Sequence, residues 1–191
     1  MNILTYILSC LYFFLPAYFA NMTPPLVRGA RFLKILDREV DFGRHPPTTL
    51  FKDGQPILGP HKRWRGVIFG IIVGMLVVWG QSWLYQYEAV QRISFLNYQK
   101  IDILLFGFLI SAGAVCGDLF FAFIKRRLKI PPGTRFIPWD QTNYVIGAYI
   151  FLTPVFKIDI LIWITLFIFT FLLHIIVNRL GYCLKLHRAK W

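Results

Sequence analysis

The sequence predicts an all-α integral membrane protein with about five transmembrane helices in a single domain of residues 1–191. Of these residues 57% are hydrophobic and only 16% are charged, and the mean hydropathy is +0.55. Apolar runs of about 20 residues, the length that crosses a hydrocarbon core about 30 Å thick, recur along the chain. The composition is too apolar for an ordinary soluble domain, whose one core could not bury all of these runs.

The expected spans are residues 3–20, 66–85, 101–123, 137–156 and 158–177. No basic residue precedes Ile3 and no clear small-residue cleavage site follows Ala20, so we expect a retained first helix rather than a cleaved signal peptide. The middle three spans carry glycines and small polar residues, which suit close helix packing in lipid. Ile, Leu, Phe and Trp dominate the last span, so we expect lipid to cover most of it.

Basic residues lie mostly on one side of the predicted membrane. The loops 21–65 and 124–136 and the C-terminal tail together hold 18 of the 21 Lys and Arg residues. Since cytoplasmic loops carry the excess of Lys and Arg, we expect the N-terminus outside, the C-terminus in the cytoplasm and the two loops on the cytoplasmic face of the cell membrane. Anionic lipid head groups account for much of this charge, and no nucleic-acid-binding motif is present.

Two acids are placed near membrane level at this predicted cytoplasmic face. Asp118 lies inside the third apolar run and Asp140 near the start of the fourth, with a Pro-Pro-Gly turn at residues 131–133 between them. A carboxylate near a bilayer centre costs about 2.5–3.5 kcal/mol, so it usually pairs with a cation or metal or faces a wet cavity. With the nearby polar residues Asn21, Gln141 and Asn143, the two acids suit Mg²⁺, which proteins bind through one or two carboxylates plus phosphates and water.

Cations follow these acids along the chain. On a helix Asp118, Ala122 and Lys125 share one face, with Arg126 directly beside it. Phosphate is the ligand that such cations bind, because Arg can engage it with two hydrogen bonds and Lys acts as a point charge. The expected phosphate-binding cations are Lys62, Arg65, Lys125, Arg126 and Arg127.

The acidic and basic residues also have simpler interpretations that involve no catalysis. Asp118 could form only an intramembrane salt bridge, with Lys125 as its first candidate partner. The basic run that ends with Arg127 could serve topology alone. We expect no chemistry from His61, a loop residue, or from His174, a single imidazole in a lipid-facing helix.

Four ordered motifs give the chain a resemblance to the CDP-archaeol synthase family, membrane cytidylyltransferases distantly related to CDP-diacylglycerol synthases. The motifs lie at residues 16–24, where Pro-Ala-Tyr-Phe-Ala-Asn is followed by Pro24, at 59–66 (Gly-Pro-His-Lys-Arg-Trp-Arg-Gly), at 117–127 (Gly-Asp to Lys-Arg-Arg) and at 140–143 (Asp-Gln-Thr-Asn). They span nearly the whole chain. The resemblance implies transfer of CMP from CTP to an archaeal-type ether lipid phosphate, with Mg²⁺ as cofactor and pyrophosphate as the second product.

On this basis we expect the catalytic residues to be Asp118, Lys125 and Asp140, and the metal ligands to be Asp118 and Asp140. The expected nucleotide-binding residues are Asn21, Lys62, Arg65, Arg126, Arg127, Gln141 and Asn143. The chain departs from the family pattern at three positions: Arg63 replaces Thr, Ala122 replaces Ser, and Asn143 replaces an acid. The last change removes a negative charge, which predicts weaker binding of Mg²⁺.

A non-catalytic membrane scaffold or a transporter is the alternative function. Transporters typically show paired repeats, broken helices and ionisable residues at the midplane. In this sequence no repeat is apparent, and the polar residues gather toward one membrane face. The pattern therefore favours chemistry on a lipid head group.

Overall fold

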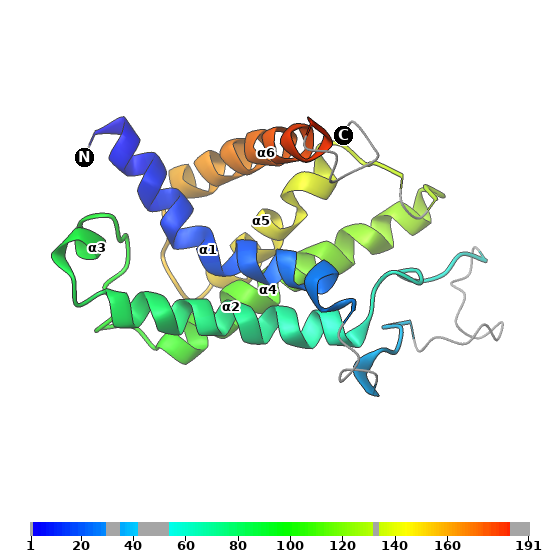
Figure 1. Cartoon of the computed structure of the whole chain (residues 1–191), viewed down its shortest axis with the longest axis horizontal. Coiled ribbons are helices and arrows are strands. Elements are labelled where there is room, and N and C mark those ends of the chain that lie inside the picture. Colours follow the sequence, from blue (N-terminus) through cyan, green and yellow to red (C-terminus); the bar gives the residue numbers. More distant parts are fainter. Residues whose placement is uncertain (1, 30–34, 42–53, 132–133, 184–191) are drawn as a thin grey trace.

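The structure is a computed structural model that describes residues 2–29, 35–41, 54–131 and 134–183. The described chain is helical, and its helices are α1 (Ile3–Val27), α2 (Trp64–Leu84), α3 (Glu88–Arg92), α4 (Ile103–Arg127), α5 (Trp139–Leu152) and α6 (Ile160–Cys183) (Figure 1). Extended pairing among the described residues is limited to one isolated antiparallel bridge between Glu39 and Arg63. The all-α prediction is confirmed.

Four of these helices, α1, α2, α4 and α6 up to Val177, are long and apolar enough to cross a membrane. The expected span 137–156 corresponds to α5, which has 14 residues and therefore extends only about 21 Å. Pro138 precedes this helix and Pro154 follows its C-cap, Thr153. Because Pro154 has no backbone N–H to donate to the carbonyl oxygen one turn before it, α5 ends earlier than its hydropathy predicts.

Two helices extend farther toward the predicted cytoplasmic side than expected. Helix α1 continues through Asn21 to Val27, so the prediction that the loop begins at residue 21 is wrong. Pro24 and Pro25 fall in its last turns, where few helical hydrogen bonds remain to be lost. Helix α4 continues to Arg127, whose charge and those of the two preceding residues stabilise the negative end of the helix dipole.

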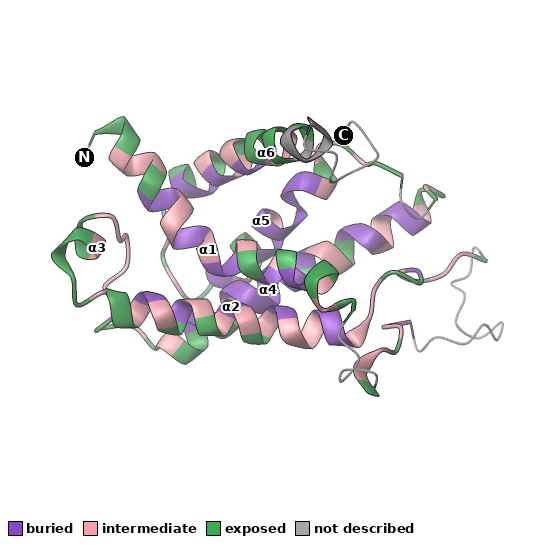
Figure 2. Ribbon diagram, in the orientation of Figure 1, coloured by how far each residue is buried: buried purple, intermediate pink, exposed green. Residues whose placement is uncertain are grey.

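The core lies where α1, α2, α4 and α5 pack together. Helix α4 contacts both α2 and α5, and α6 packs against α1 and α5 (Figure 1). Phe13 and Phe14 of α1 are almost fully buried, and both form edge-to-face contacts with Trp163 of α6. A hydrogen bond of 2.7 Å joins Tyr18 Oη to Thr170 Oγ1. Purple, buried segments of the ribbon face the centre of the bundle, whereas α6 shows much green on its outer side (Figure 2).

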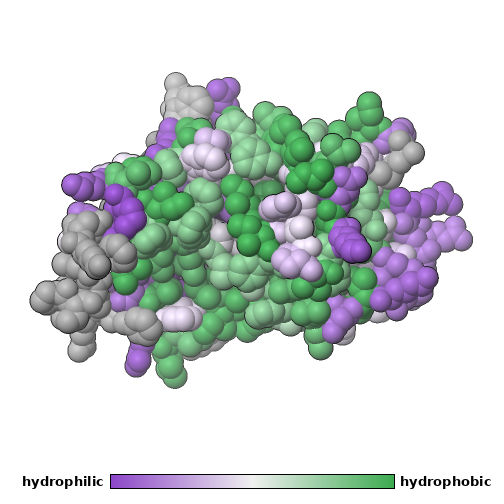
Figure 3. All heavy atoms as spheres, turned by 180° about the vertical axis from the view of Figure 1, so that it is seen from behind, coloured by the Kyte–Doolittle hydropathy of each residue, from purple (hydrophilic) through white to green (hydrophobic). Residues whose placement is uncertain are grey.

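The polar residues of the described chain gather at two ends of the molecule. The N-terminus and α3 lie at one end, and the segments before α2 and after α4 lie at the other (Figure 1). Hydrophobic side chains cover the surface between these ends, as a bilayer requires (Figure 3). Lys125, Arg126 and Arg127 lie at the end where α4 finishes. The assignment of this end to the cytoplasm is a prediction from charge.

Candidate active site

The close approach of α4 and α5 positions the site. Gly117 of α4 lies against the backbone of Asn143, and Gly147 of α5 lies against the backbone of Gly113. A Cβ atom at Gly117 or Gly147 would overlap a carbonyl oxygen of the other helix. Only glycine permits this spacing, which brings Asp118, the residue after Gly117, directly opposite the first turns of α5.

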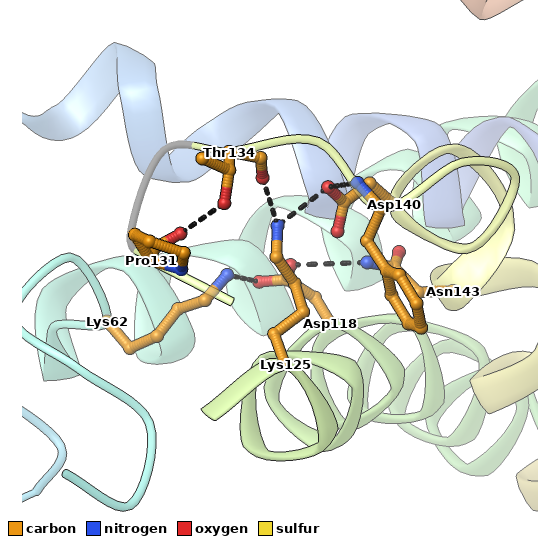
Figure 4. Close-up of polar contacts among 8 residues, drawn as sticks. Lys62, Asp118, Lys125, Pro131, Thr134, Asp140 and Asn143 are labelled. Carbon is orange, nitrogen blue, oxygen red and sulfur yellow. Dashed lines mark hydrogen bonds and ion pairs between the residues drawn. The ribbon is translucent and has the colours of Figure 1, made fainter. Parts of the chain in front are cut away.

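Asp118 forms an ion pair with Lys62. The distance from Lys62 Nζ to Asp118 Oδ2 is 2.6 Å, and Asn143 Nδ2 lies 3.5 Å from Asp118 Oδ1 (Figure 4). Asp118 lies nine residues before the end of α4, or about 13 Å along the helix axis. A salt bridge at Asp118 was one of the expected possibilities, but the partner is Lys62 rather than Lys125.

Lys125 joins α4 to α5 on the opposite side of the cluster. Its Nζ atom donates to Asp140 Oδ2 at 2.7 Å and to the carbonyl oxygen of Thr134 at 2.7 Å (Figure 4). Asp140 Oδ2 also accepts a hydrogen bond of 3.0 Å from the backbone N–H of Phe136. The turn after α4 therefore returns Asp140 to the level of the Lys125 ammonium group, as the sequence predicted.

The segment that carries Lys62 is held from two sides. Asp41 is buried, and its carboxylate accepts hydrogen bonds from the backbone N–H groups of Leu58, at 2.9 and 3.0 Å, and Gly59, at 2.8 Å. The Arg127 guanidinium donates to the carbonyl oxygen of Pro56 at 2.5 Å. Gly59 has a φ of +98°, a left-handed conformation that glycine adopts without strain. These contacts place Lys62 over the end of α4.

Two cavities meet at this cluster, and both are lined by Lys62, Asp118, Lys125, Asp140 and Asn143. We call the smaller one, of about 140 Å³, the loop cavity; its other lining residues are Leu58, Gly59, His61, Ala122 and Arg126. We call the larger one, of about 470 Å³, the α6 cavity; its other lining residues are Thr134, Arg135, Ile137, Gln141, Phe171, His174 and Ile175. The shared polar cluster thus forms the wall between two spaces.

Several buried polar atoms at the cluster lack a hydrogen-bond partner among the described residues. They are Asn143 Oδ1, Gln141 Oε1 and Arg126 Nε. Buried polar groups are normally satisfied, so two amide oxygens and one guanidinium N–H here are available to ligands. The described residues contain no group of three or more His, Cys, Asp and Glu side chains that could hold a metal. Two carboxylates with neighbouring amide oxygens nevertheless fit a hard divalent cation, which takes its remaining ligands from phosphate and water.

Seven of the expected site residues come together at the cluster: Lys62, Asp118, Lys125, Arg126, Asp140, Gln141 and Asn143. Three do not. Asn21 lies on α1 and lines neither cavity, and Arg127 contacts the segment before Lys62. Arg65 is buried, and its guanidinium lies 3.3 Å from the carboxylate of Asp37.

Asp37 also explains the departure at Arg63. Arg63 Nη1 donates a hydrogen bond of 2.5 Å to Asp37 Oδ1. This hydrogen bond holds the pKa of Asp37 below the ordinary value of an aspartate. Arg63 and Arg65 together line a separate cavity of about 300 Å³ beside the end of α1. Arg63 is therefore an ion-pair partner that orients the chain just before α2.

His174 is a cavity residue that the sequence interpretation missed. It lines the α6 cavity with Asp118 and Asp140, although α6 as a whole is an apolar helix with many exposed side chains, as expected for a lipid-facing helix. A sequence signal existed: Thr170 and His174 are four residues apart in an otherwise apolar segment, and this spacing places them on one face of α6. Thr170 is buried against α1.

The helical fold and the paired charges at membrane level define an integral membrane protein with a polar site at one end of its bundle. A family profile described as CarS-like, CDP-archaeol synthase, matches residues 3–191. The chain therefore belongs to the CDP-archaeol synthase family.

Individual relatives agree with this membership. A CDP-archaeol synthase of Pyrococcus furiosus is 35% identical over 185 residues, covering 97% of this chain and 98% of the relative. One of Thermococcus gammatolerans is 37% identical over 191 residues and covers both chains completely. A solved structure of an intramembrane enzyme for archaeal membrane lipid biosynthesis superposes with a TM-score of 0.69 at 25% identity, covering 90% of this chain and 94% of that one.

Proposed function

We propose that this enzyme transfers CMP from CTP to 2,3-bis-O-geranylgeranyl-glycerol 1-phosphate, or to a closely related lipid phosphate, at the cytoplasmic face of the cell membrane. One observation carries the proposal. Two carboxylates and three cations, Lys62, Lys125 and Arg126, gather around two cavities with shared lining residues at one end of a membrane bundle. Family membership supports a CTP-dependent lipid cytidylyltransferase, and the charge of the loops supports the cytoplasmic side.

The reaction exchanges one phosphoanhydride bond for another. An oxygen of the lipid phosphate forms a bond to the α-phosphorus of CTP, and the bond from this phosphorus to the bridging oxygen of the β-phosphate breaks. Pyrophosphate leaves with the bonding electrons. The lipid phosphate is already ionised at neutral pH, so the protein supplies no covalent nucleophile and no general base. Positioning and electrostatic stabilisation remain as its tasks.

The cations of the cluster match these tasks. Lys62 and Lys125 each place the ammonium group within 2.7 Å of a carboxylate, and both side chains line the two cavities. Arg126 is buried, and its Nε meets no acceptor among the residues that the structure describes. We propose that these three groups bind the triphosphate and stabilise the charge that spreads toward the leaving pyrophosphate.

The acids and amides match a divalent cofactor. We propose that Asp118 and Asp140 hold Mg²⁺, with Asn143 and Gln141 as neighbouring oxygen donors. Bound Mg²⁺ supplies positive charge that neutralises phosphate oxygens. In the ligand-free chain the two lysines balance the same carboxylates. On substrate binding, the two carboxylates would therefore bind the metal in place of the lysines, and the two lysines would bind the nucleotide phosphates in place of the carboxylates.

Pyrophosphate release from purified protein in detergent tests the proposal. We expect release only when CTP, the lipid phosphate and Mg²⁺ are all present, with a CDP-lipid detected by mass spectrometry. Asp118→Asn should lower the rate at least about 100-fold, because a catalytic metal contributes several kcal/mol to transition-state stabilisation. Asp102→Asn is the matched control, since Asp102 caps the opposite end of the same helix. Turnover by Asp118→Asn at the rate of this control would contradict the proposal.

A further inference from the structure

The two cavities at the polar cluster differ in what surrounds them. The loop cavity is bounded by the segment that carries Lys62 and by the last turns of α4. The α6 cavity is bounded by α5, by the turn at residues 134–137 and by α6. Of its α6 residues, Phe171 and Ile175 are apolar and His174 is polar. The residues that line the α6 cavity are therefore mainly polar, with apolar side chains at Ile137, Phe171 and Ile175.

A separate apolar groove of about 240 Å³ runs between α5 and α6. It is lined by Val145, Ile146 and Tyr149 of α5 and by Ile160, Trp163, Ile164, Phe167 and Ile168 of α6. The groove lies open to the surroundings of the bundle, because Ile164 and Ile168 are each 50% exposed. Its exposed surface is accordingly hydrocarbon-facing.

The apolar groove and the α6 cavity lie about one helical turn apart along both α5 and α6. Along α5, Val145 follows the cavity residue Gln141 by one turn. Along α6, Phe167 precedes the cavity residue Phe171 by one turn. The lining residues of the two spaces thus follow one another along α5 and α6, and this row of residues is apolar in the groove and polar near Asp140. A molecule with a long apolar chain and one anionic head matches this distribution.

We propose that His174 binds the phosphate of the lipid substrate, whose chain lies in the apolar groove between α5 and α6. This inference rests on the proposed function and assigns one of its two substrates to a place. Imidazole donates a hydrogen bond in either protonation state, so His174 can bind a phosphate oxygen. Arg135, on the same side of the cluster, adds positive charge.

The apolar groove does not match the chemistry of the nucleotide. CTP is soluble and carries no apolar chain, so burial against isoleucine and phenylalanine side chains gives it little. The loop cavity instead offers Arg126 and backbone from Leu58 to Lys62 near the shared wall. The two substrates then approach that wall from opposite sides, an arrangement that suits attack of a lipid phosphate oxygen on the α-phosphorus.

Variants at His174 test the phosphate contact. In His174→Leu we expect the KM for a synthetic digeranylgeranyl glyceryl phosphate to rise about tenfold, because a hydrogen bond to a charged group is lost. The KM for CTP should stay within about twofold of the wild-type value, a change much smaller than the one expected for the lipid. His174→Gln keeps an N–H donor and should recover most of the lipid affinity. Equal effects of His174→Leu on both KM values, or none on either, would overturn the inference.

Bulky variants on α6 test the groove with a matched pair. Ile168 lines the groove and is 50% exposed, whereas Ile176 lines neither space and is 52% exposed. We expect Ile168→Trp to raise the KM for the digeranylgeranyl lipid but not for an analogue with two ethyl ethers in place of the long chains. Ile176→Trp should leave both values unchanged. A response of both lipids to Ile168→Trp, or of neither, would overturn the placement of the chain.

Lipid binding without CTP separates this inference from the proposed function. The wild-type protein should bind the digeranylgeranyl phosphate more tightly than His174→Leu does in native mass spectrometry or thermophoresis. If the wild type binds in this way but releases no pyrophosphate from CTP, the proposed function fails and the lipid site stands. If it turns over normally while His174→Leu and Ile168→Trp bind and react like the wild type, the lipid site fails alone. A wild type that binds no lipid phosphate overturns the inference directly.

Discussion

Lys125 of α4 and Asp140 of α5 form an ion pair of 2.7 Å whose ammonium group also donates to the carbonyl oxygen of Thr134. The pair joins the last turns of α4 to the first turn of α5. Lys125 is largely buried, with its side chain 11% exposed, and the Asp140 side chain is 29% exposed. Charges in such a position stabilise each other but cost free energy when separated.

Replacing both members of this pair should destabilise the protein by less than the sum of the two single replacements. We expect Lys125→Met and Asp140→Asn each to lower the free energy of unfolding by about 1–3 kcal/mol, because each leaves a charge or a backbone group without its partner. The double variant should lose less than the sum, with a coupling of about 0.5–3 kcal/mol. Thermal unfolding of all four proteins in the same detergent measures this cycle. Strictly additive losses would show that the pair is not coupled.

Gly147→Ala should separate α4 from α5. The added Cβ would overlap the backbone of Gly113, and overpacking of this kind costs about 1–3 kcal/mol. Because the shift also moves Asp140 and Asn143 relative to Asp118, we expect cytidylyl transfer to fall together with the unfolding temperature.

Gly80→Ala is the control for this change. A Cβ at Gly80 meets nothing within 4 Å, and alanine is favoured over glycine inside a helix by about 0.5–1 kcal/mol. Equal stability of Gly147→Ala and Gly80→Ala would contradict the close α4–α5 packing.

The sequence predicts much of this arrangement because two of its patterns are local. Helical periodicity placed Asp118 and Lys125 on one face of α4, and both line the same cavities. The Pro-Pro-Gly segment predicted the return of Asp140 toward Lys125, which their ion pair confirms, although residues 132 and 133 lie outside the described chain. Hydropathy located the four long helices, since length and apolar composition decide which segments cross a bilayer.

The remaining features, the partners and directions of individual side chains, depend on which helix surfaces pack together. Hydropathy carries no information about this packing. The segment that Asp41 holds in place determines the ion-pair partner of Asp118. The partner is therefore Lys62, and not Lys125, which is closer to Asp118 in the sequence. Helix α6 is apolar on nearly every side, and its periodicity therefore gives no direction for His174. Arg65 follows Lys62 closely in the sequence, but the turn into α2 directs it to Asp37.

Asn143→Asp should strengthen metal binding. Asn143 stands where the family pattern has an acid, and its buried Oδ1 has no partner among the described residues. A third carboxylate beside Asp118 adds negative charge, so we expect the Mg²⁺ concentration for half-maximal activity to fall about three- to tenfold, which corresponds to roughly 1 kcal/mol. In EDTA the same variant should unfold at a lower temperature than the wild type, because the acids then repel each other.

Titration of activity with Mg²⁺ at saturating CTP measures the first effect, and thermal unfolding with and without Mg²⁺ measures the second. Asn143→Ala removes the amide oxygen without adding charge and should shift the Mg²⁺ requirement upward. A metal requirement that is the same in Asn143→Asp and Asn143→Ala would exclude position 143 from the metal site.

Asp41→Asn should loosen the segment that presents Lys62. Its carboxylate accepts the backbone N–H groups of Leu58 and Gly59, and hydrogen bonds to a charged acceptor contribute about 1.5–3 kcal/mol each. We expect the KM for CTP to rise about tenfold, or roughly 1.4 kcal/mol, because part of the binding energy must then order this segment. Limited proteolysis should cleave the variant faster between residues 54 and 63.

Asp159→Asn provides the matched comparison. Asp159 also accepts a backbone N–H, that of Leu161 at 2.9 Å, but it does so at the start of α6, away from the cavities. This variant should lose about 0.5–2 kcal/mol of stability, as expected for a weakened helix start, with an unchanged KM for CTP. If Asp41→Asn likewise lowers only the unfolding temperature, Asp41 supports the fold without positioning Lys62. A selective rise in KM for CTP, with Asp159→Asn unaffected, would instead establish that a buried carboxylate remote from the substrates sets the geometry of the nucleotide site.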